Sequence, residues 1–143
     1  MFRLFLSALF WTLLMVPGNV SALSCEAASF SSGAYVTPQS RFSFLDKVHI
    51  KVFCRDLSPG SHAVTVDWLD PYQEIVRQDS QSMDLQQKGN RSLFFWIKLV
   101  KKGAMARMFS GSDFNPKFIG QWTARVYFDD QVVSLVQFNF EPL

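Results

Sequence analysis

The residues of this chain that could do acid–base or metal chemistry are few and widely spaced. Its two histidines are His49, at an outward position of an alternating stretch, and His62, at the start of another. His62 could form a dyad with Asp67 or Asp70, but no nucleophile stands out beside them by its sequence context. A metal centre would need clustered His, Cys, Asp or Glu side chains with a recognisable spacing. The sequence therefore predicts a protein that is not an enzyme and has no bound metal or cofactor.

Four aspartates offer oxygen ligands of the kind that calcium prefers. Asp129 and Asp130 lie together in a predicted turn, and Asp67 and Asp70 flank Trp68. A calcium site needs three or more such groups that converge with carbonyl oxygens. We interpret these aspartates as solvated turn residues, whose charge also deters pairing between sheet edges.

The beginning of the chain has the pattern of a secretory signal peptide. Arg3 supplies a positive charge, Leu4–Val16 is apolar, and Val20–Ala22 has the small residues of a cleavage site. The apolar run is short for a membrane span, although an uncleaved N-terminal anchor is an alternative. We therefore expect a signal peptide over residues 1–22 and an exported, periplasmic or secreted, domain over residues 23–143.

The two cysteines, Cys25 and Cys54, both belong to this expected mature domain. An even number of cysteines in an exported domain predicts one disulfide bond. The pair lacks the Cys-x-x-Cys spacing that lowers a thiol pKa in redox proteins, so we expect a structural role. Lipidation of Cys25 is an alternative, but Leu23 stands one position too late for the bacterial lipoprotein pattern.

Charge and composition narrow the classes of partner. The chain has 14 basic and 12 acidic side chains, and cleavage would remove only Arg3, so the mature domain is close to neutral. Such a balance supplies no long-range field for nucleic acid or an anionic membrane. The 15 phenylalanines predict a core of large rings and leave room for an aromatic surface.

Alternating apolar and polar residues predict a series of short strands separated by turn residues. The predicted strands cover 27–36, 46–55, 62–69, 74–77 and 91–100, followed by a hairpin over 120–140. Residues 78–90 are polar and form either a loop or a short edge strand. Because both faces of 91–100 are apolar, that strand is either buried on both sides or exposes Phe94 and Trp96.

The hairpin has a register that can be predicted, because a slip by one residue exchanges the two faces. A three-residue loop at 129–131 brings the apolar residues of the two strands opposite one another. The predicted pairs are Trp122 with Phe138, Ala124 with Val136, and Phe128 with Val132. A two-residue loop would instead set Trp122 opposite Gln137. The predicted outward residues are Tyr127, Val133 and Leu135.

Two features resemble a known class of domain. Trp68, midway along the chain on the third core strand, is similar to the buried tryptophan of immunoglobulin-like domains. The run GQWTARVYFD at 120–129, followed by a strand that ends Phe138-Asn139-Phe140, resembles the last two strands of many bacterial exported immunoglobulin-like domains. The resemblance implies an all-β, antiparallel, immunoglobulin-like or fibronectin-type sandwich of about seven strands. It is specific for a fold and not for a function.

The connection at 101–118 is the strongest candidate for a binding surface, together with the outward aromatic residues of the strand before it. Long loops in compact domains are often functional, and methionine and aromatic side chains suit adaptable contacts. The candidate residues are Phe94, Trp96, Lys101, Lys102, Met105, Arg107, Met108, Phe109 and Phe114. The alternative is that the apolar residues of the connection only plug the open end of the sandwich.

These observations together predict a non-enzymatic module that binds another envelope or secreted protein. Carbohydrate binding is the alternative, for which Trp96, Trp122 or Tyr72 would have to be exposed and coplanar.

Overall fold

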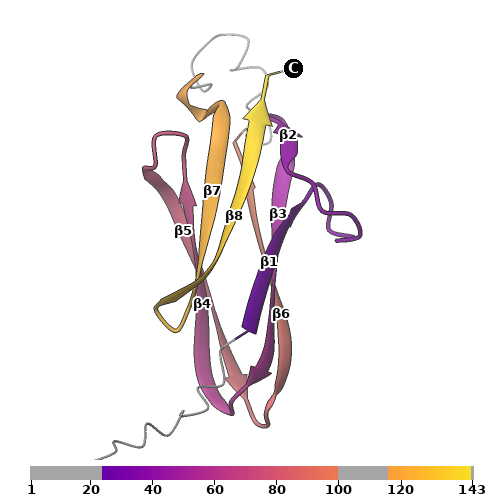
Figure 1. Cartoon of the computed structure of the whole chain (residues 1–143), viewed down its shortest axis with the longest axis vertical. Helices are drawn as coiled ribbons and strands as arrows, with labels where there is room; N and C mark the ends of the chain where they lie inside the picture. Colours follow the sequence, from indigo (N-terminus) through magenta and orange to yellow (C-terminus); the bar gives the residue numbers. More distant parts are fainter. Residues whose placement is uncertain (1–23, 100–115, 143) are drawn as a thin grey trace, which may run out of the picture.

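The computed structural model describes residues 24–99 and 116–142, and nearly all regular structure there is β-strand (Figure 1). The strands are β1 (Ser24–Phe30), β2 (Arg41–Ser43), β3 (Lys47–Leu57), β4 (Gly60–Leu69), β5 (Ile75–Leu85), β6 (Gly89–Lys98), β7 (Gly120–Phe128) and β8 (Gln131–Glu141). A short 3-10 helix, η1 (Pro116–Phe118), precedes β7. In these ranges no helix has the length and apolar character to cross a membrane. The predicted signal peptide lies outside them.

The strands form two sheets, which confirms the all-β class. One sheet has the order β1-β3-β6 and the other has the order β2-β8-β7-β4-β5. Neighbouring strands are antiparallel, except that β2 runs parallel to β8, with Phe42 opposite Phe140. A purely antiparallel sandwich was therefore not quite the correct expectation.

The core lies between the sheets and follows the two-residue alternation of the strands. In β3 the alternate residues Val48, Ile50, Val52 and Cys54 are fully buried, as predicted. Other fully buried side chains come from the facing sheet. They are Val64, Val66 and Trp68 of β4, Trp122, Ala124 and Val126 of β7, and Phe138 of β8.

The predicted disulfide is confirmed. Cys25 of β1 lies directly opposite Cys54 of β3, and their sulfur atoms are 2.06 Å apart. The bond therefore joins the first strand to the central strand of the smaller sheet. That first strand begins and ends earlier than predicted, at Ser24–Phe30 instead of 27–36, because a turn starts at Ser31.

The strand predicted at 74–77 is present but longer than predicted, because β5 extends from Ile75 to Leu85 and pairs with β4 along its length. It is the edge strand of the larger sheet, so one of its sides has no strand neighbour. Its polar residues either face water or lie between the two edge strands β5 and β6, where the sandwich is not closed by a further strand. Hydrophobic alternation is therefore weak in this segment, although it is a regular strand.

The terminal hairpin confirms two predicted pairs, Trp122 with Phe138 and Ala124 with Val136, but not the predicted turn. The turn has two residues, Asp129 and Asp130, whose φ angles of 45° and 68° suit a tight hairpin. The register shifts by one residue near the turn, where Tyr127 lies opposite Val132.

Val133 is therefore the extra residue of a β-bulge, which reconciles the short turn with the apolar pairing farther along. As a result, Val132 is 54% exposed, whereas Val133 packs against the core. The outward strip consists of Tyr127, Val132 and Leu135, and the predicted outward position of Val133 was wrong.

We expect loss of the disulfide to lower the free energy of unfolding by about 3–4 kcal/mol, because an open loop of this length gains entropy in the unfolded chain. The variant is Cys25→Ser with Cys54→Ala, measured by urea denaturation. The wild type denatured with a reducing agent should match this variant. A difference below about 1 kcal/mol would show that the β1–β3 ladder needs no covalent support.

Candidate functional site

The outer surface of the β1-β3-β6 sheet is aromatic and basic. Residues opposite one another in neighbouring strands point to the same side, so the register places Phe30, His49 and Trp96 in one row. Its aromatic side chains, with Tyr35 from the β1–β2 connection, are Phe30, Tyr35, His49, Phe53, Phe94 and Trp96. Its charged side chains are Glu26, Lys47, Lys51, Arg55 and Lys98. We call this surface the basic aromatic face.

Tyr35 joins the three strands across this face. Its ring centroid is 5.4 Å from that of Phe30 on β1, 5.8 Å from His49 on β3 and 4.6 Å from Phe94 on β6. Its hydroxyl lies 3.4 Å from Nδ1 of His49. Burial raises the pKa of Tyr35, and burial together with the charge of Lys47 lowers the pKa of His49. This pair is therefore uncharged at neutral pH.

Phe94 and Trp96 remain half exposed, at 44% and 48%. Between them Phe95 points into the core, so β6 is buried on one side only and exposes aromatic rings on the other. The ammonium of Lys47 lies 3.9 Å from the centre of the Trp96 ring, a favourable cation–π distance. Of the two alternatives that the sequence left open for this strand, the structure has the exposed aromatic patch.

Positive charge exceeds negative charge on the face. Lys47, Lys51, Arg55 and Lys98 are cations, and the carboxylates beside them are Glu26 of β1 and the exposed Asp56 at the bulged end of β3. Glu26 lies 3.9 Å from Arg55, but both side chains are largely exposed. Such a pair contributes little stability and neutralises one charge locally. The face therefore has a net positive charge, although the whole chain is nearly neutral.

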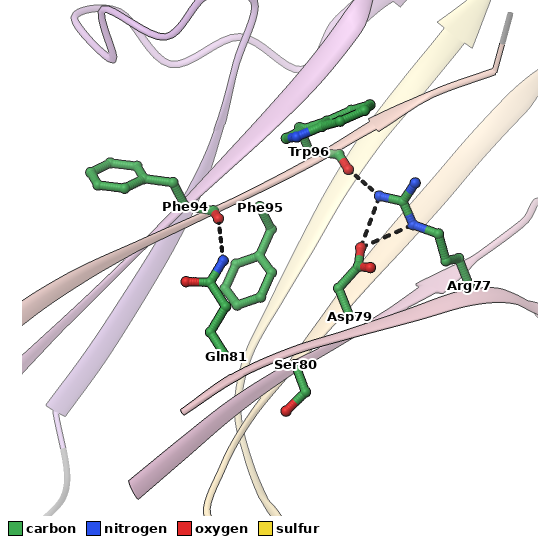
Figure 2. A pocket seen from close by; sticks show the side chains of 7 residues that line it. All are labelled: Arg77, Asp79, Ser80, Gln81, Phe94, Phe95 and Trp96. Atoms are coloured by element: carbon green, nitrogen blue, oxygen red, sulfur yellow. Dashed lines mark hydrogen bonds and ion pairs between the residues drawn. The ribbon is translucent and has the colours of Figure 1, made fainter. Parts of the chain in front are cut away.

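The free edge of β6 is covered by side chains from β5 (Figure 2). Nε2 of Gln81 donates a hydrogen bond of 2.6 Å to the Phe94 carbonyl, and the guanidinium of Arg77 donates to the Trp96 carbonyl. These carbonyls would otherwise be available to a partner strand. The exposed aromatic side chains beside them, and not this part of the backbone edge, are what β6 offers to a partner.

Arg77 also belongs to a hydrogen-bonded bridge that includes Asp79 and the buried Trp68. The indole Nε1–H of Trp68 donates to Oδ2 of Asp79 at 2.8 Å, and Nε of Arg77 donates to the same oxygen at 2.9 Å. Asp79 therefore satisfies a donor that belongs to a fully buried side chain. This carboxylate links the larger sheet, through Arg77, to the backbone of the smaller one.

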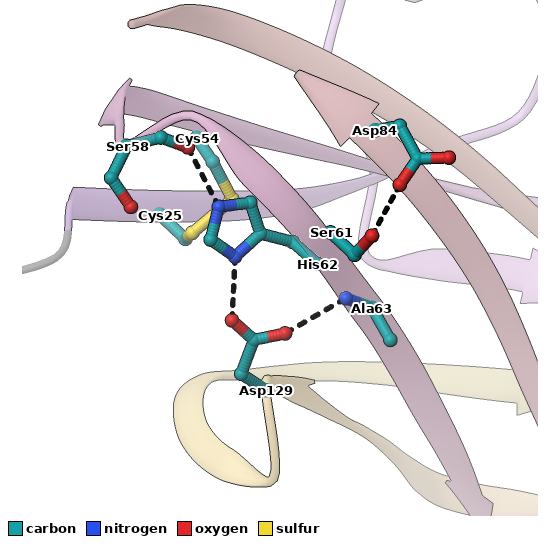
Figure 3. A network of polar contacts seen from close by, with 8 residues as sticks. All are labelled: Cys25, Cys54, Ser58, Ser61, His62, Ala63, Asp84 and Asp129. Atoms are coloured by element: carbon teal, nitrogen blue, oxygen red, sulfur yellow. Dashed lines mark hydrogen bonds and ion pairs between the residues drawn. A yellow bond between two sulfur atoms is a disulfide. The ribbon is translucent and has the colours of Figure 1, made fainter. Parts of the chain in front are cut away.

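His62 is held by two acceptors at one end of the sandwich (Figure 3). Its Nδ1 is 2.6 Å from Oδ2 of Asp129, and its Nε2 is 2.7 Å from the carbonyl oxygen of Ser58. Since both partners accept, both ring nitrogens donate, which requires the protonated ring. The hydrogen bond to Asp129, and then that to Ser58, raise the pKa of His62 despite its burial.

Asp129 is in turn held by the backbone of β4, because its Oδ1 accepts a 2.8 Å hydrogen bond from the Ala63 amide. Burial alone would raise the pKa of Asp129, but the hydrogen bonds from His62 and Ala63 and the charge of His62 lower it. His62 has no ring nitrogen left to act as a base. It fastens the β3–β4 turn to the β7–β8 turn.

The dyad of His62 with Asp67 or Asp70 that the sequence left possible is not formed, since His62 contacts Asp129 and Ser58 instead. These two aspartates are also not solvated, since they are 3% and 0% exposed. Asp67 accepts from Gln78 at 2.6 Å and pairs with Arg125 at 3.3 Å. Asp70 accepts from backbone amides of the β4–β5 turn. In residues 24–99 and 116–142, no three His, Cys, Asp or Glu side chains are grouped to hold a metal ion.

The predicted binding residues divide into two groups. Phe94 and Trp96 lie on the basic aromatic face. The remaining ones lie outside the described residues, and they are Lys101, Lys102, Met105, Arg107, Met108, Phe109 and Phe114. Trp122, a candidate for sugar stacking, is fully buried, whereas Tyr72 is 69% exposed.

Sequence reasoning missed Tyr35 and the grouping of the cations. The alternation of β3 already indicated that Lys51 and Arg55 point outward. Their placement beside Phe94 and Trp96 depends on a β3–β6 pairing between segments far apart in the chain, which no local pattern reveals.

Comparisons with known proteins add a likeness in fold. No protein-family model matches the sequence, and no curated protein matches it. Among solved structures, the crystal structure of a β-glucosidase from Listeria innocua in complex with glucose is similar, with a TM-score of 0.51 and 12% sequence identity. The match covers 85% of this chain and 17% of that protein, so the chain spans a small part of its length. At this identity the likeness concerns the fold alone.

We expect Asp79→Ala to lower the free energy of unfolding by about 1–2 kcal/mol, because it leaves the Trp68 indole without its acceptor. Asp84→Ala is the matched control, since Asp84 is an exposed carboxylate of the same strand, and its cost should be below about 0.5 kcal/mol. Asp79→Asn, which keeps an oxygen acceptor, should fall between them. Equal costs for the two alanine variants in urea denaturation would contradict the role given to this bridge.

We expect His62 to stabilise the fold most in mildly acidic solution. A raised histidine pKa contributes stability that is complete below the unfolded value of 6.5 and is lost as pH rises through the folded pKa. The lowered Asp129 pKa contributes stability above its ordinary value of 3.8. The stability lost in His62→Gln should therefore be largest at about pH 5–6 and shrink toward pH 8.

The free energy of unfolding of the wild type and the variant is measured by urea denaturation across this pH range. His49→Gln is the control, because a lowered histidine pKa gives a pH dependence of the opposite sign. A loss in His62→Gln that is constant with pH would show that folding does not raise the pKa of His62.

Proposed function

We propose that this chain is an exported, non-enzymatic module of immunoglobulin-like or fibronectin-type fold that binds another protein through the basic aromatic face. The observation that carries the proposal is the half-exposure of Phe94 and Trp96, two residues apart on one side of β6. Large rings at the centre of a surface are the residues most often found to dominate protein binding.

The finer assignment of the fold rests on the order of the strands. A sheet of three strands, β1-β3-β6, faces a second sheet in which the last two strands pair with β4. The buried Trp68 on β4 and the short β2 running parallel to β8 agree with a sandwich of this family.

Export is supported by two independent features. The N-terminal segment has the order of a charged residue, an apolar run and small residues that signal peptides share. The Cys25–Cys54 disulfide is of a kind that persists in oxidising compartments. The two together support the proposed periplasmic or secreted location.

The connection 101–118 is included in the proposal because it follows β6 closely in the sequence. Like the face it contains basic and phenylalanine residues, and it adds the adaptable side chains of Met105 and Met108. We propose that both contribute to one binding surface.

A non-enzymatic role is supported by how the histidines are used. Both nitrogens of His62 are engaged with Asp129 and Ser58, and His49 is packed against Tyr35. Among the described residues, the hydroxyl that lies close to a nitrogen of His49 is that of Tyr35, and burial raises the pKa of this hydroxyl, which makes it a poor nucleophile.

Carbohydrate binding is a second candidate because Trp96 and Tyr72 are exposed. Against it, the ammonium of Lys47 lies over the Trp96 ring and the ring of Tyr35 lies against Phe94. The two neighbouring rings that could form a stacking platform are therefore each partly occupied.

The test is affinity capture from the envelope and secreted fractions of the source organism, with three versions of the mature domain. Phe94→Ser/Trp96→Ser alters the face, and Val132→Ser/Leu135→Ser changes equally exposed apolar residues on the other sheet. We expect a protein that the wild type and the control retain, and that binds the face variant at least about tenfold more weakly in calorimetry.

Identical capture by all three folded proteins would refute the proposal. Binding of a glycan array by the wild type, lost in the face variant, with no captured protein, would establish the carbohydrate alternative instead.

A further inference from the structure

The cations of the basic aromatic face are regularly spaced along β3. Outward positions of this strand are occupied in turn by Lys47, His49, Lys51, Phe53 and Arg55, so that cations and rings alternate. With a rise of about 3.3 Å per residue, neighbouring cations are about 13 Å apart along the strand. A ring lies between each two of them.

The strands on each side extend this arrangement. Lys47 lies opposite Lys98 on β6, and Lys51 lies opposite Phe94. His49 is kept neutral by burial and by Lys47, which lower its pKa, so it adds no charge. Every outward cation of β3 is therefore beside an aromatic side chain of its own strand or of the next.

We infer that the partner's contact surface is an acidic protein segment in which carboxylates alternate with apolar side chains. This inference rests on the proposed function and specifies the chemistry of the partner. An extended segment places side chains of one face about 7 Å apart, so an acidic residue at every fourth position, with an apolar residue midway, matches the spacing of the face.

Charge complementarity carries the choice of occupant. Four cations against two carboxylates, Glu26 and Asp56, which lie at the Arg55 end of the face, would repel a basic partner and would leave a neutral partner with buried, unpaired ammonium groups. Glu26 is placed at the β1 side of the face, where it pairs with Arg55 and leaves Lys47, Lys51 and Lys98 without an acidic neighbour on the face. A carboxylate from the partner would supply the missing counter-charge.

An extended partner would not need to pair with the edge of β6. Arg77 and Gln81 already occupy the carbonyls of Trp96 and Phe94 there. Recognition would therefore depend on side chains of the face, and its affinity should decrease with salt.

The test uses synthetic peptides as probes, with binding to the mature domain measured by fluorescence anisotropy. The acidic probe has the pattern Glu-Ser-Phe-Ser repeated and ends in Glu, and the neutral probe has Gln in place of every Glu. We expect the acidic probe to bind at least about tenfold more tightly than the neutral one at low salt. Raising the salt from about 0.05 to about 0.3 M should remove most of that difference.

Two variants with the same change of charge locate the site. Lys51→Gln/Arg55→Gln alters the face, and Arg41→Gln/Lys88→Gln removes two exposed cations outside it. The first should weaken binding of the acidic probe about tenfold, and the second should leave it within about twofold. Circular dichroism checks that each variant is folded.

Each contrary result has a distinct meaning. Equal binding of both probes, lost in Phe94→Ser/Trp96→Ser, would refute the acidic partner and leave the proposed function standing. Tighter binding of a sulfated oligosaccharide than of the acidic probe would overturn both. Absence of binding by either probe would refute the inference, and the capture experiment would still decide the proposed function.

Discussion

The strict alternation of β3 is the constraint on which the rest of the structure depends. One side of this strand supplies Val48, Ile50, Val52 and Cys54 to the core, and none of them is exposed. A shift of one residue would bury Lys51 and Arg55 instead, and the free energy needed to bury these unpaired charges would exceed the stability of the fold. The same alternation therefore fixes the core, the partner of Cys25 and the orientation of the basic aromatic face.

Local patterns in the sequence were sufficient where a strand has one apolar and one polar side. They predicted the inward residues of β3 and β4, the disulfide, and the far pairs of the hairpin, and they left the exposure of Phe94 and Trp96 as one of two alternatives. They failed for β5, because its polar side chains donate hydrogen bonds to backbone carbonyls of the other sheet and do not form part of an apolar core. They also failed at Val133, because a bulge is set by the geometry of the turn beside it and not by hydrophobic periodicity.

The candidate site could be predicted only in part, for a related reason. The exposed rings of β6 are visible in its sequence, but the cations beside them come from another strand. Tyr35 reaches the face from the β1–β2 connection, where its own φ angle is 51°. An alternating pattern in the sequence does not indicate such a position. The buried aspartates show the same limit, since Asp67 and Asp70 are buried by partners that only the folded chain brings to them.

The position of the disulfide has a mechanical consequence for a domain held at one end. Cys25 is near the start of the described fold and Cys54 is near the end of β3, at a sequence separation of 29. Tension applied along the polypeptide would pass from Cys25 directly to Cys54 through the sulfur atoms. Strands β1 and β2 and most of β3 lie inside this covalent loop. These residues would not be extended under load. The pairing of β1 with β3 would therefore persist after the C-terminal strands had been pulled away.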